Sequence, residues 1–354
     1  METNMKAAVK TADGKFDLQN VDVPAILQPD WVIARVRVAG ICGTDLRHWN
    51  KAEEALTGKI MGHELAGEIV ATGEDVKHLQ PGDRVVIETL LGDDTCEWCK
   101  VQQYNLCPHL YEVRMKTLSQ AFAQFVAGPS RKFYKLPDHV SFEEATLLDT
   151  FSVCHHALQL SKLQLNDKVA IIGAGPIGLG QLQLAKLAGA DVIVTDVVDA
   201  SLELARELGA DMVINSSKED SYQQVKEFTL GRGADIVFEC AGGPSIPTTL
   251  PQAVSFSRIR GKVVIVGGFD PGVTNIGLEW QHIQMSEIQL VPSASYAYRD
   301  IYPEMQICLD LLAKGQLNAK KMITHSFPLE EINKAFQVAQ DKESTHAVFV
   351  ALNI

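Results

Sequence analysis

Two places in the first third of the chain hold side chains that could bind a metal ion. At the first, Cys42 stands in the stretch Gly-Ile-Cys-Gly-Thr-Asp, and His63, followed by Glu64, comes 21 residues later. A thiolate, an imidazole and carboxylates from separate loops suit a catalytic zinc ion, which needs three protein ligands and one exchangeable position. Singly these residues decide nothing, because a lone cysteine is more often a small apolar residue and a lone histidine a hydrogen-bonded structural group.

The second place lies between residues 91 and 108, where the hydrophobic pattern disappears and cysteine, aspartate and tryptophan predominate. Three of the chain's seven cysteines crowd between Cys96 and Cys107. In a long chain that looks intracellular, an odd number of cysteines crowded in this way favours thiols for a metal over disulfides. We therefore expect a loop that is held by a metal ion rather than by a hydrophobic core.

A glycine-rich turn in the middle of the chain could bind a dinucleotide. Gly173, Gly175 and Gly178 form the pattern Gly-x-Gly-x-x-Gly, with Pro176 and Ile177 inside it, directly after an expected strand and at the start of an expected helix. The first glycine allows the tight turn, the second lets a pyrophosphate approach the backbone, and the third lets helix and strand pack closely. The helix N-terminus adds free N–H groups and partial positive charge.

An acidic residue at the end of the next expected strand supports the prediction of a dinucleotide site. Asp196 comes 18 residues after Gly178, where its carboxylate can accept hydrogen bonds from the adenosine ribose hydroxyls. Residues 197–199, Val-Val-Asp, offer no cation for a 2′-phosphate, so we expect NAD rather than NADP. The alternative is a glycine-rich turn without a ligand, and the coincidence of strand, turn, helix and acid argues against it.

The elements that must position these residues change character along the chain. Up to about residue 89, short β-branched runs separated by Gly, Pro and Asp predict an antiparallel β region. Later, apolar strands alternate with amphipathic helices, as in a parallel sheet covered on both faces. The six strands are expected at 168–172, 191–196, 211–214, 235–239, 262–266 and 287–291. We expect an α/β chain with a catalytic domain at 1–150, a doubly wound nucleotide domain at 151–291, and a return of 292–354 to the first domain.

The composition of the chain argues against some classes of binding partner. The chain has 354 residues, 46% of them hydrophobic, and a formal net charge of -12 without any cluster of lysines and arginines. This balance argues against a nucleic-acid or anionic-membrane partner, and we expect a small-molecule ligand. No apolar run reaches the length of a signal peptide or a membrane span, so a cytoplasmic location is expected.

Several motifs occur in an order that identifies a resemblance. GICGTD, GHELAGEIVATG, PGDRV, the cysteine-rich loop and GAGPIG follow one another along the chain. Together they resemble the zinc-dependent medium-chain alcohol dehydrogenase family, closest to its polyol (sorbitol) and threonine dehydrogenase branches, over essentially the whole chain. The resemblance implies a GroES-like, largely antiparallel catalytic domain, a Rossmann domain, zinc and a nicotinamide cofactor.

The resemblance also implies the ligands of a catalytic zinc. Cys42 and His63 match two of them, and Glu64 matches a ligand or near neighbour that can exchange with water. The remaining ligand is usually a Cys or a Glu, and Asp149 takes its place here, with a shorter reach. By the same resemblance, Asp45 would orient the His63 ring.

The family's structural zinc uses the pattern C-x2-C-x2-C-x7-C, and this chain keeps the spacing with aspartate in the first place. The implied ligands are Asp93, Cys96, Cys99 and Cys107. Zinc accepts an aspartate oxygen, so we expect a bound structural zinc. The alternative is a reduced cysteine cluster that packs without metal.

For proton transfer, the resemblance makes Thr44 the group that takes the hydroxyl proton toward the nicotinamide ribose. A histidine five residues after the first cysteine often completes this relay, but Arg47 stands there and His48 is one further on. Two alternatives therefore stay open: His48 is the terminal base, or the proton leaves Thr44 through water. Ile177 and the backbone near Val266 and Gly267 are expected to line the nicotinamide.

These expectations describe an NAD-dependent zinc dehydrogenase that acts on a secondary hydroxyl of a polyol, sugar or related small alcohol. Threonine 3-dehydrogenase or a simple secondary-alcohol dehydrogenase is the nearest alternative, and a non-catalytic nucleotide-binding protein is a remote one. The family resemblance implies a homodimer or homotetramer assembled through the edge strand at 287–291.

Asp196→Ala combined with Val197→Arg is expected to shift the ratio of the Kd values for NADPH and NADH toward NADPH by at least about tenfold, because the carboxylate is replaced by a cation. Fluorescence titration of both reduced cofactors measures this ratio. Unchanged selectivity would show that Asp196 does not contact the adenosine ribose.

Overall fold

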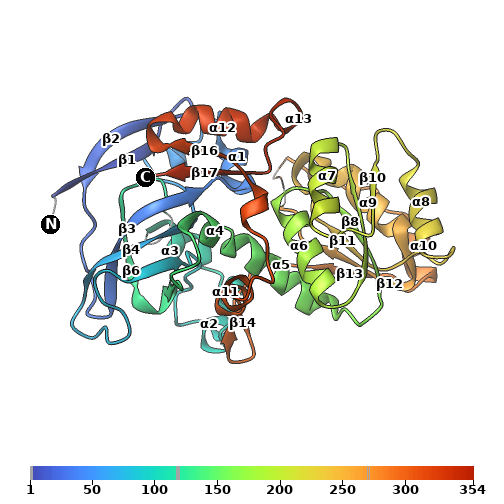
Figure 1. Ribbon diagram of the computed structural model, residues 1–354, viewed down its shortest axis with the longest axis horizontal. Helices are drawn as coiled ribbons and strands as arrows, with labels where there is room; N and C mark the ends of the chain where they lie inside the picture. The colour runs from blue at the N-terminus through green and yellow to red at the C-terminus, as the bar shows by residue number, and fades with distance from the viewer. Residues whose placement is uncertain (1–2, 117–119, 269, 271) are drawn as a thin grey trace. The chain divides into compact units, whose positions relative to one another are not determined.

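The computed structural model describes residues 3–116, 120–268, 270 and 272–354, which form two compact units (Figure 1). Unit 1 contains Met1–Asp149, Asp300–Gly315 and Ile323–Ile354. Unit 2 contains Thr150–Arg299 and Gln316–Met322. Each unit has its own sheet and its own hydrophobic core.

The tail of the chain differs from the expected return of 292–354 to the first domain, because two pieces of it belong to unit 2. The physical reason is visible at Gln183, whose side chain accepts a hydrogen bond from the Asn318 N–H at 2.6 Å and donates to the Met322 sulfur at 3.3 Å. These contacts fix residues 316–322 to the nucleotide-domain helix that contains Gln183.

Unit 1 is built on a mostly antiparallel seven-stranded sheet. Its path is β16 (Ile323–Pro328), β17 (Phe349–Asn353), β3 (Trp31–Gly40), β4 (Glu64–Thr72), β5 (Arg84–Ile87) and β7 (Phe133–Lys135), with β6 (Phe125–Pro129) paired to β3. A separate hairpin joins β1 (Asn4–Lys10) to β2 (Phe16–Asp22). The antiparallel β region expected from the sequence is therefore confirmed.

Short helices surround this sheet, and an aromatic cluster fills part of the core between them. The helices are α1 (Gly43–His48), α2 (Glu97–Lys100), α3 (Leu110–Lys116), α4 (Phe142–Thr146), α11 (Glu304–Ala313), α12 (Ile332–Gln340) and α13 (Lys342–Thr345). Phe336 on α12 packs against Phe16 and Phe122, with ring centroids 5.0 and 5.8 Å away. This packing holds α12 on the sheet near α1.

Unit 2 contains a parallel six-stranded sheet with the order β10-β9-β8-β11-β12-β13. The strands are β8 (Lys168–Ile172), β9 (Asp191–Asp196), β10 (Met212–Asn215), β11 (Ala234–Glu239), β12 (Ser257–Ile265) and β13 (Gln289–Pro292). The helices are α5 (Leu148–Ser161, which begins in unit 1), α6 (Pro176–Leu187), α7 (Asp199–Glu207), α8 (Ser221–Phe228), α9 (Ile246–Phe256) and α10 (Trp280–Met285). The chain winds from β8 outward to β10 and returns to β11, so the strand order reverses between β8 and β11. Ligands of doubly wound sheets bind at such a reversal.

Apart from the larger sheets, the two-residue strands β14 (Tyr298–Arg299) and β15 (Tyr302–Pro303) form a separate two-stranded sheet. The doubly wound sheet expected from the sequence is confirmed, and β8 and β9 begin and end at the expected residues. β12 begins at Ser257 rather than at residue 262. No helix in the described part of the chain is long and apolar enough to span a membrane.

Candidate functional site

The pairing of β3 with β4 brings the first group of potential metal ligands together. Gly40 at the end of β3 pairs with Glu64 at the start of β4, so Cys42 and His63, just beyond these strand ends, become neighbours. A Cβ atom on Gly40 would lie 2.3 Å from the Phe349 ring and 2.5 Å from Glu64 Oε2, so a larger residue would force these side chains to move. The sheet register therefore determines that these two segments of sequence meet in one place.

The donor atoms of Cys42, His63 and Glu64 all lie within 4.8 Å of one another, with His63 and Glu64 buried. Burial raises the pKa of Glu64 well above its usual value, and the charge of Cys42 adds to this effect. Burial also disfavours the Cys42 thiolate, but the charge and hydrogen bond of His63 outweigh it and lower the pKa of the thiol. A thiol, an imidazole and a carboxyl group at these separations match the donor set of a zinc ion.

Asp45 connects this group to α1. One of its carboxylate oxygens accepts a hydrogen bond from the Cys42 N–H at 3.1 Å, and the other lies 3.6 Å from His63 Nδ1. Asp45 is 2% exposed. Because ligating histidines generally present their second ring nitrogen to a carboxylate, this arrangement fits the orienting role expected for Asp45.

Asp149 stands apart from the tight group. It is buried in the first turn of α5, and its charge contributes to raising the pKa of Glu64, after burial and the charge of Cys42. Among the described residues, the donor atoms that lie within 4.8 Å of one another are those of Cys42, His63 and Glu64, without Asp149.

In the second group of potential metal ligands, all four expected residues lie together. Donor atoms of Asp93, Cys96, Cys99 and Cys107 lie within 4.8 Å of one another. The backbone N–H groups of Cys96 and Thr95 donate to Asp93 Oδ1 and hold the pKa of Asp93 well below its usual value. Burial raises the pKa of the Cys99 thiol to about 12, with contributions from Cys96 and Cys107. Three thiols and a carboxylate that stays ionised fit a zinc ion, which displaces thiol protons when it binds.

A buried ion pair connects this cysteine-rich loop to the sheet. Lys132 Nζ donates to Glu88 Oε1 at 2.7 Å, and both side chains are almost fully buried. Tyr104, which lies within the loop, donates its hydroxyl to the same carboxylate, as does Tyr134 on β7. No motif in the sequence indicates this connection, which involves four residues far apart along the chain.

Thr44 and Arg47 lie one turn apart on α1. Arg47 Nη2 donates to Thr44 Oγ1 at 2.8 Å. His48 points to a different partner, because its Nδ1 lies 3.0 Å from a Glu53 carboxylate oxygen, and Glu53 also accepts from the buried Lys10. Sequence analysis noted the arginine but missed its bond to Thr44. The i, i+3 spacing on a short helix was the available signal.

In unit 2, the glycine-rich turn adopts the expected strand-turn-helix geometry. Gly173 has a φ of 100°, which favours glycine, and Gly175 is the N-cap of α6. A Cβ atom on Gly178 would lie 1.7 Å from the Gly173 carbonyl oxygen, so only glycine fits there. The N-terminus of α6 can therefore approach a phosphate group closely.

Asp196 lies beside this turn. Its Oδ2 accepts from the Ala174 N–H at 2.5 Å, and its Oδ1 accepts from the Val197 and Val198 N–H groups at 2.7 and 2.9 Å. A carboxylate offers about four lone-pair positions, so these contacts leave capacity for ribose hydroxyls. Val197 is 62% exposed and leaves the space beside the carboxylate without a cation.

The remaining expected cofactor residues also lie at the carboxyl ends of the strands. Val266 and Gly267 directly follow β12, and both donate their N–H groups to the Glu239 carbonyl at 2.9 Å. Ile177 lies in the first turn of α6, and its carbonyl accepts from the Cys154 thiol. Thus the glycine-rich turn, Asp196 and Val266–Gly267 share one end of the parallel sheet.

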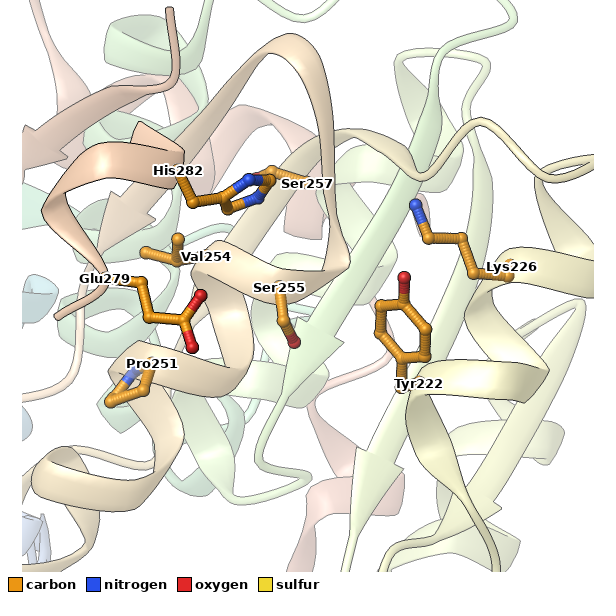
Figure 2. A pocket seen from close by; sticks show the side chains of 8 residues that line it. All are labelled: Tyr222, Lys226, Pro251, Val254, Ser255, Ser257, Glu279 and His282. Atoms are coloured by element: carbon orange, nitrogen blue, oxygen red, sulfur yellow. The ribbon is translucent and has the colours of Figure 1, made fainter. Parts of the chain in front are cut away.

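A cavity of about 320 Å³ lies at the other end of unit 2. Figure 2 shows its lining, with Tyr222 and Lys226 from α8 on one side and Glu279 and His282 near α10 on the other. The lining of the cavity includes Ser257, the first residue of β12, and so lies at the amino end of this strand. Cofactors bind beyond the carboxyl ends of parallel strands. None of the expected cofactor residues lines this cavity, so it is not the dinucleotide crevice.

Comparison with known proteins gives two family matches that together cover most of both units. Residues 28–138 match the alcohol dehydrogenase GroES-like domain. Residues 176–313 match the zinc-binding dehydrogenase family. The two groups of potential metal ligands lie in or next to the first match, apart from Asp149, and the turn from Pro176 onward lies in the second.

Curated relatives match along nearly the whole chain. A sorbitol dehydrogenase of Bacillus subtilis is 35% identical, with 95% of this chain and 94% of the relative covered. A D-arabitol-phosphate dehydrogenase of Enterococcus avium is 37% identical, with 95% and 94% covered.

Solved structures show the same architecture. An oxidoreductase of unknown specificity from Escherichia coli superposes with a TM-score of 0.88 at 30% identity, with 99% of each chain covered. A protein from E. coli CFT073 described as a short chain alcohol dehydrogenase, solved in complex with NADH, gives a TM-score of 0.86 at 25% identity, with 100% of each chain covered.

The two ligand groups predict about two zinc ions per chain, because each offers a donor set that zinc accepts. Elemental analysis of the purified protein measures the content. Cys42→Ser is expected to remove one zinc and Cys99→Ser the other, whereas Cys308→Ser, a buried thiol outside both groups, should leave the content unchanged. A content of one zinc that Cys99→Ser does not alter would exclude the second site.

Proposed function

This chain belongs to the zinc-binding medium-chain alcohol dehydrogenase family, and on that premise we propose that it oxidises a secondary hydroxyl group of a polyol, sugar or related small alcohol with NAD. The observation that supports this most directly is the convergence of Cys42, His63 and Glu64 in unit 1. The glycine-rich turn and Asp196 in unit 2 supply the second requirement, a dinucleotide site.

The relatives favour polyols over the alternatives. The two curated relatives described above are named for sorbitol and for D-arabitol phosphate, a neutral polyol and a phosphorylated one. Threonine and simple secondary alcohols remain the alternative substrates, because specificity depends on loop residues that differ between relatives at this level of identity. A polyol, neutral or phosphorylated, is therefore the substrate class that we propose.

NAD is the proposed cofactor. Asp196 lies where a carboxylate can accept from a ribose hydroxyl, and the exposed Val197 beside it offers no charge to a 2′-phosphate. The related structure that contains NADH is consistent with this choice.

The proposed ligands of the catalytic zinc are Cys42, His63 and either Glu64 or Asp149. Zinc, when bound, supplies a Lewis acid that polarises the substrate oxygen, and the nicotinamide supplies the hydride acceptor. The chain's own residues hold this centre: Asp45 fixes the His63 ring and the Cys42 backbone. For the second, structural zinc, we propose Asp93 with Cys96, Cys99 and Cys107 as ligands.

We propose that the substrate proton passes to Thr44 and leaves without a histidine relay. Thr44 Oγ1 accepts from Arg47, and a guanidinium stays charged and cannot take a proton. His48 directs Nδ1 to Glu53, away from this bond. The hydroxyl keeps one lone pair for the substrate and its own proton for the cofactor ribose or water. This choice favours the second of the two alternatives left open by the sequence.

Assembly into a homodimer or homotetramer is also proposed. β13 is the edge strand of the six-stranded sheet, and β12 is its neighbour on the inner side. Open strand edges readily pair with another chain. Trp280 and Met285 on the nearby α10 are 65% and 76% exposed, so a second copy could cover them while extending the sheet.

Purified protein is expected to form NADH from at least one class of a panel that contains neutral polyols, phosphorylated polyols, inositols, sugars, threonine and secondary alcohols. The signal should disappear after treatment with a strong zinc chelator and return when zinc is added, because the metal polarises the substrate oxygen. Absorbance of NADH measures both. If no compound of the panel yields NADH while zinc and NAD are bound, the proposed substrate class is contradicted.

His48→Asn is expected to leave the pH-rate profile unchanged, whereas Thr44→Val should lower kcat by about 100-fold or more, because general acid-base groups contribute at least this much. Steady-state rates across the pH range measure both effects. Loss of an inflection near neutral pH in His48→Asn would instead identify His48 as the terminal base.

A further inference from the structure

One fully buried acid in unit 2 has no role in the function proposed above. Glu239 is the last residue of β11, is 0% exposed, and pairs in register with Ile172 on β8. It therefore lies where the strand order reverses, directly beside the turn that begins at Gly173. Sequence analysis did not identify it, although an acid at the end of an apolar strand, followed by Cys-Ala-Gly-Gly, was the available signal.

Glu239 connects two loops that follow neighbouring strands. Its main-chain carbonyl accepts the N–H groups of Val266 and Gly267, both at 2.9 Å. Its Oε1 accepts the Gly242 N–H at 2.9 Å and the Thr249 hydroxyl at 2.8 Å. One residue thus fixes the loop after β11 and the loop after β12.

The backbones of these loops touch one another and the glycine-rich turn. A Cβ atom on Gly267 would lie 2.4 Å from the Gly242 nitrogen, and one on Gly173 would lie 2.9 Å from the Ala241 nitrogen. The glycine-rich turn and the two loops are therefore in direct backbone contact, and together they border the ligand-binding end of the sheet. A small displacement of Glu239 would therefore move all three.

The second carboxylate oxygen, Glu239 Oε2, is buried and has no hydrogen-bond partner among the residues that the structure describes. It lies against Gly267, where a Cβ atom would be 2.7 Å away. A buried acceptor without a donor is costly, so it requires an explanation. Its place at the carboxyl ends of β11 and β12 suggests a donor that arrives with the ligand.

We propose that Glu239 is a positioning residue for the dinucleotide: it sets the spacing of the loops at 240–243 and 266–268, and Oε2 accepts a hydrogen bond from a donor that binding of the cofactor brings, either on the cofactor or on a trapped water. This inference rests on the proposed NAD-dependent function. It assigns no proton transfer to Glu239.

The test is Glu239→Gln, which keeps the size of the side chain and an oxygen for Gly242 and Thr249 but replaces the second oxygen with a donor. NADH titration followed by fluorescence is expected to give a Kd about tenfold higher than in the wild-type protein, because an acceptor for the bound ligand is lost. Zinc content should not change, since the ligand groups lie in unit 1.

The matched control is Asp235→Asn on the same strand. Asp235 lies near the opposite end of β11, where it accepts from Arg258 and from the Lys168 N–H. The same acid-to-amide change there should alter the midpoint of thermal unfolding but keep the Kd for NADH within about twofold, because cofactors bind at the other end of the strands. A general loss of stability would affect both variants alike.

If Glu239→Gln does not fold, Glu239→Asp, which keeps the charge but shortens the side chain, is measured in the same way and should also weaken NADH binding. Wild-type protein that binds neither NADH nor NADPH would contradict the proposed function together with this inference. Wild-type binding, with the Glu239 variant binding NADH within about twofold of it, would overturn the inference alone.

Discussion

Unit 1 depends on one constraint, the burial of a thiol, an imidazole and a carboxyl group with their donor atoms within 4.8 Å of one another. Burial raises the pKa of Glu64 in this group, and the charge of Cys42 adds to the effect. The register of β3 against β4, the glycine at position 40 and the contacts of Asp45 all maintain this separation. The sheet thus holds the three donor groups at separations that match the donor set of a metal ion.

Helix α1 connects the group of potential metal ligands to Thr44, the residue proposed for proton transfer. It follows directly from Cys42, and its six residues include Thr44, Asp45 and Arg47. Its far end is held by the buried Lys10 ammonium, which donates to the His48 carbonyl and to Glu53. A displacement of this short helix would therefore disturb the metal ligands and the Thr44 hydroxyl together.

In unit 2, the close approach of backbone segments depends instead on glycines, which have no side chain. Glycines at 173, 178, 242 and 267 let the backbone segments approach to distances that a Cβ atom would not allow. Close backbone approach leaves N–H groups and helix ends directed at a ligand, but it gives few side-chain contacts that could fix the loops. Glu239 is the exception, because its side chain accepts from Gly242 in the loop after β11 while its main-chain carbonyl accepts from Val266 and Gly267 in the loop after β12.

The sequence alone determined the fold class, the two ligand groups and the nucleotide turn, because each depends on residue type and short spacing. The limits of β8 and β9 were predictable for the same reason, as apolar runs and glycines mark them locally. The start of β12 was not, because Arg258, Arg260 and Gly261 break its apolar pattern. Ser257 pairs with Ala234 on β11, and residues 258–261 lie in a register irregularity before Lys262 pairs with Ile236.

Only the tertiary structure decided which side chains face one another. It paired Arg47 with Thr44 and His48 with Glu53, left Asp149 outside the tight group, and placed the unpaired oxygen of Glu239 beside Gly267. The residues of these groups are similar polar types, and the partners that distinguish their roles come from other strands and loops. Residue types indicated which chemistry was available, and the register of strands distant in sequence decided which atoms could take part in it.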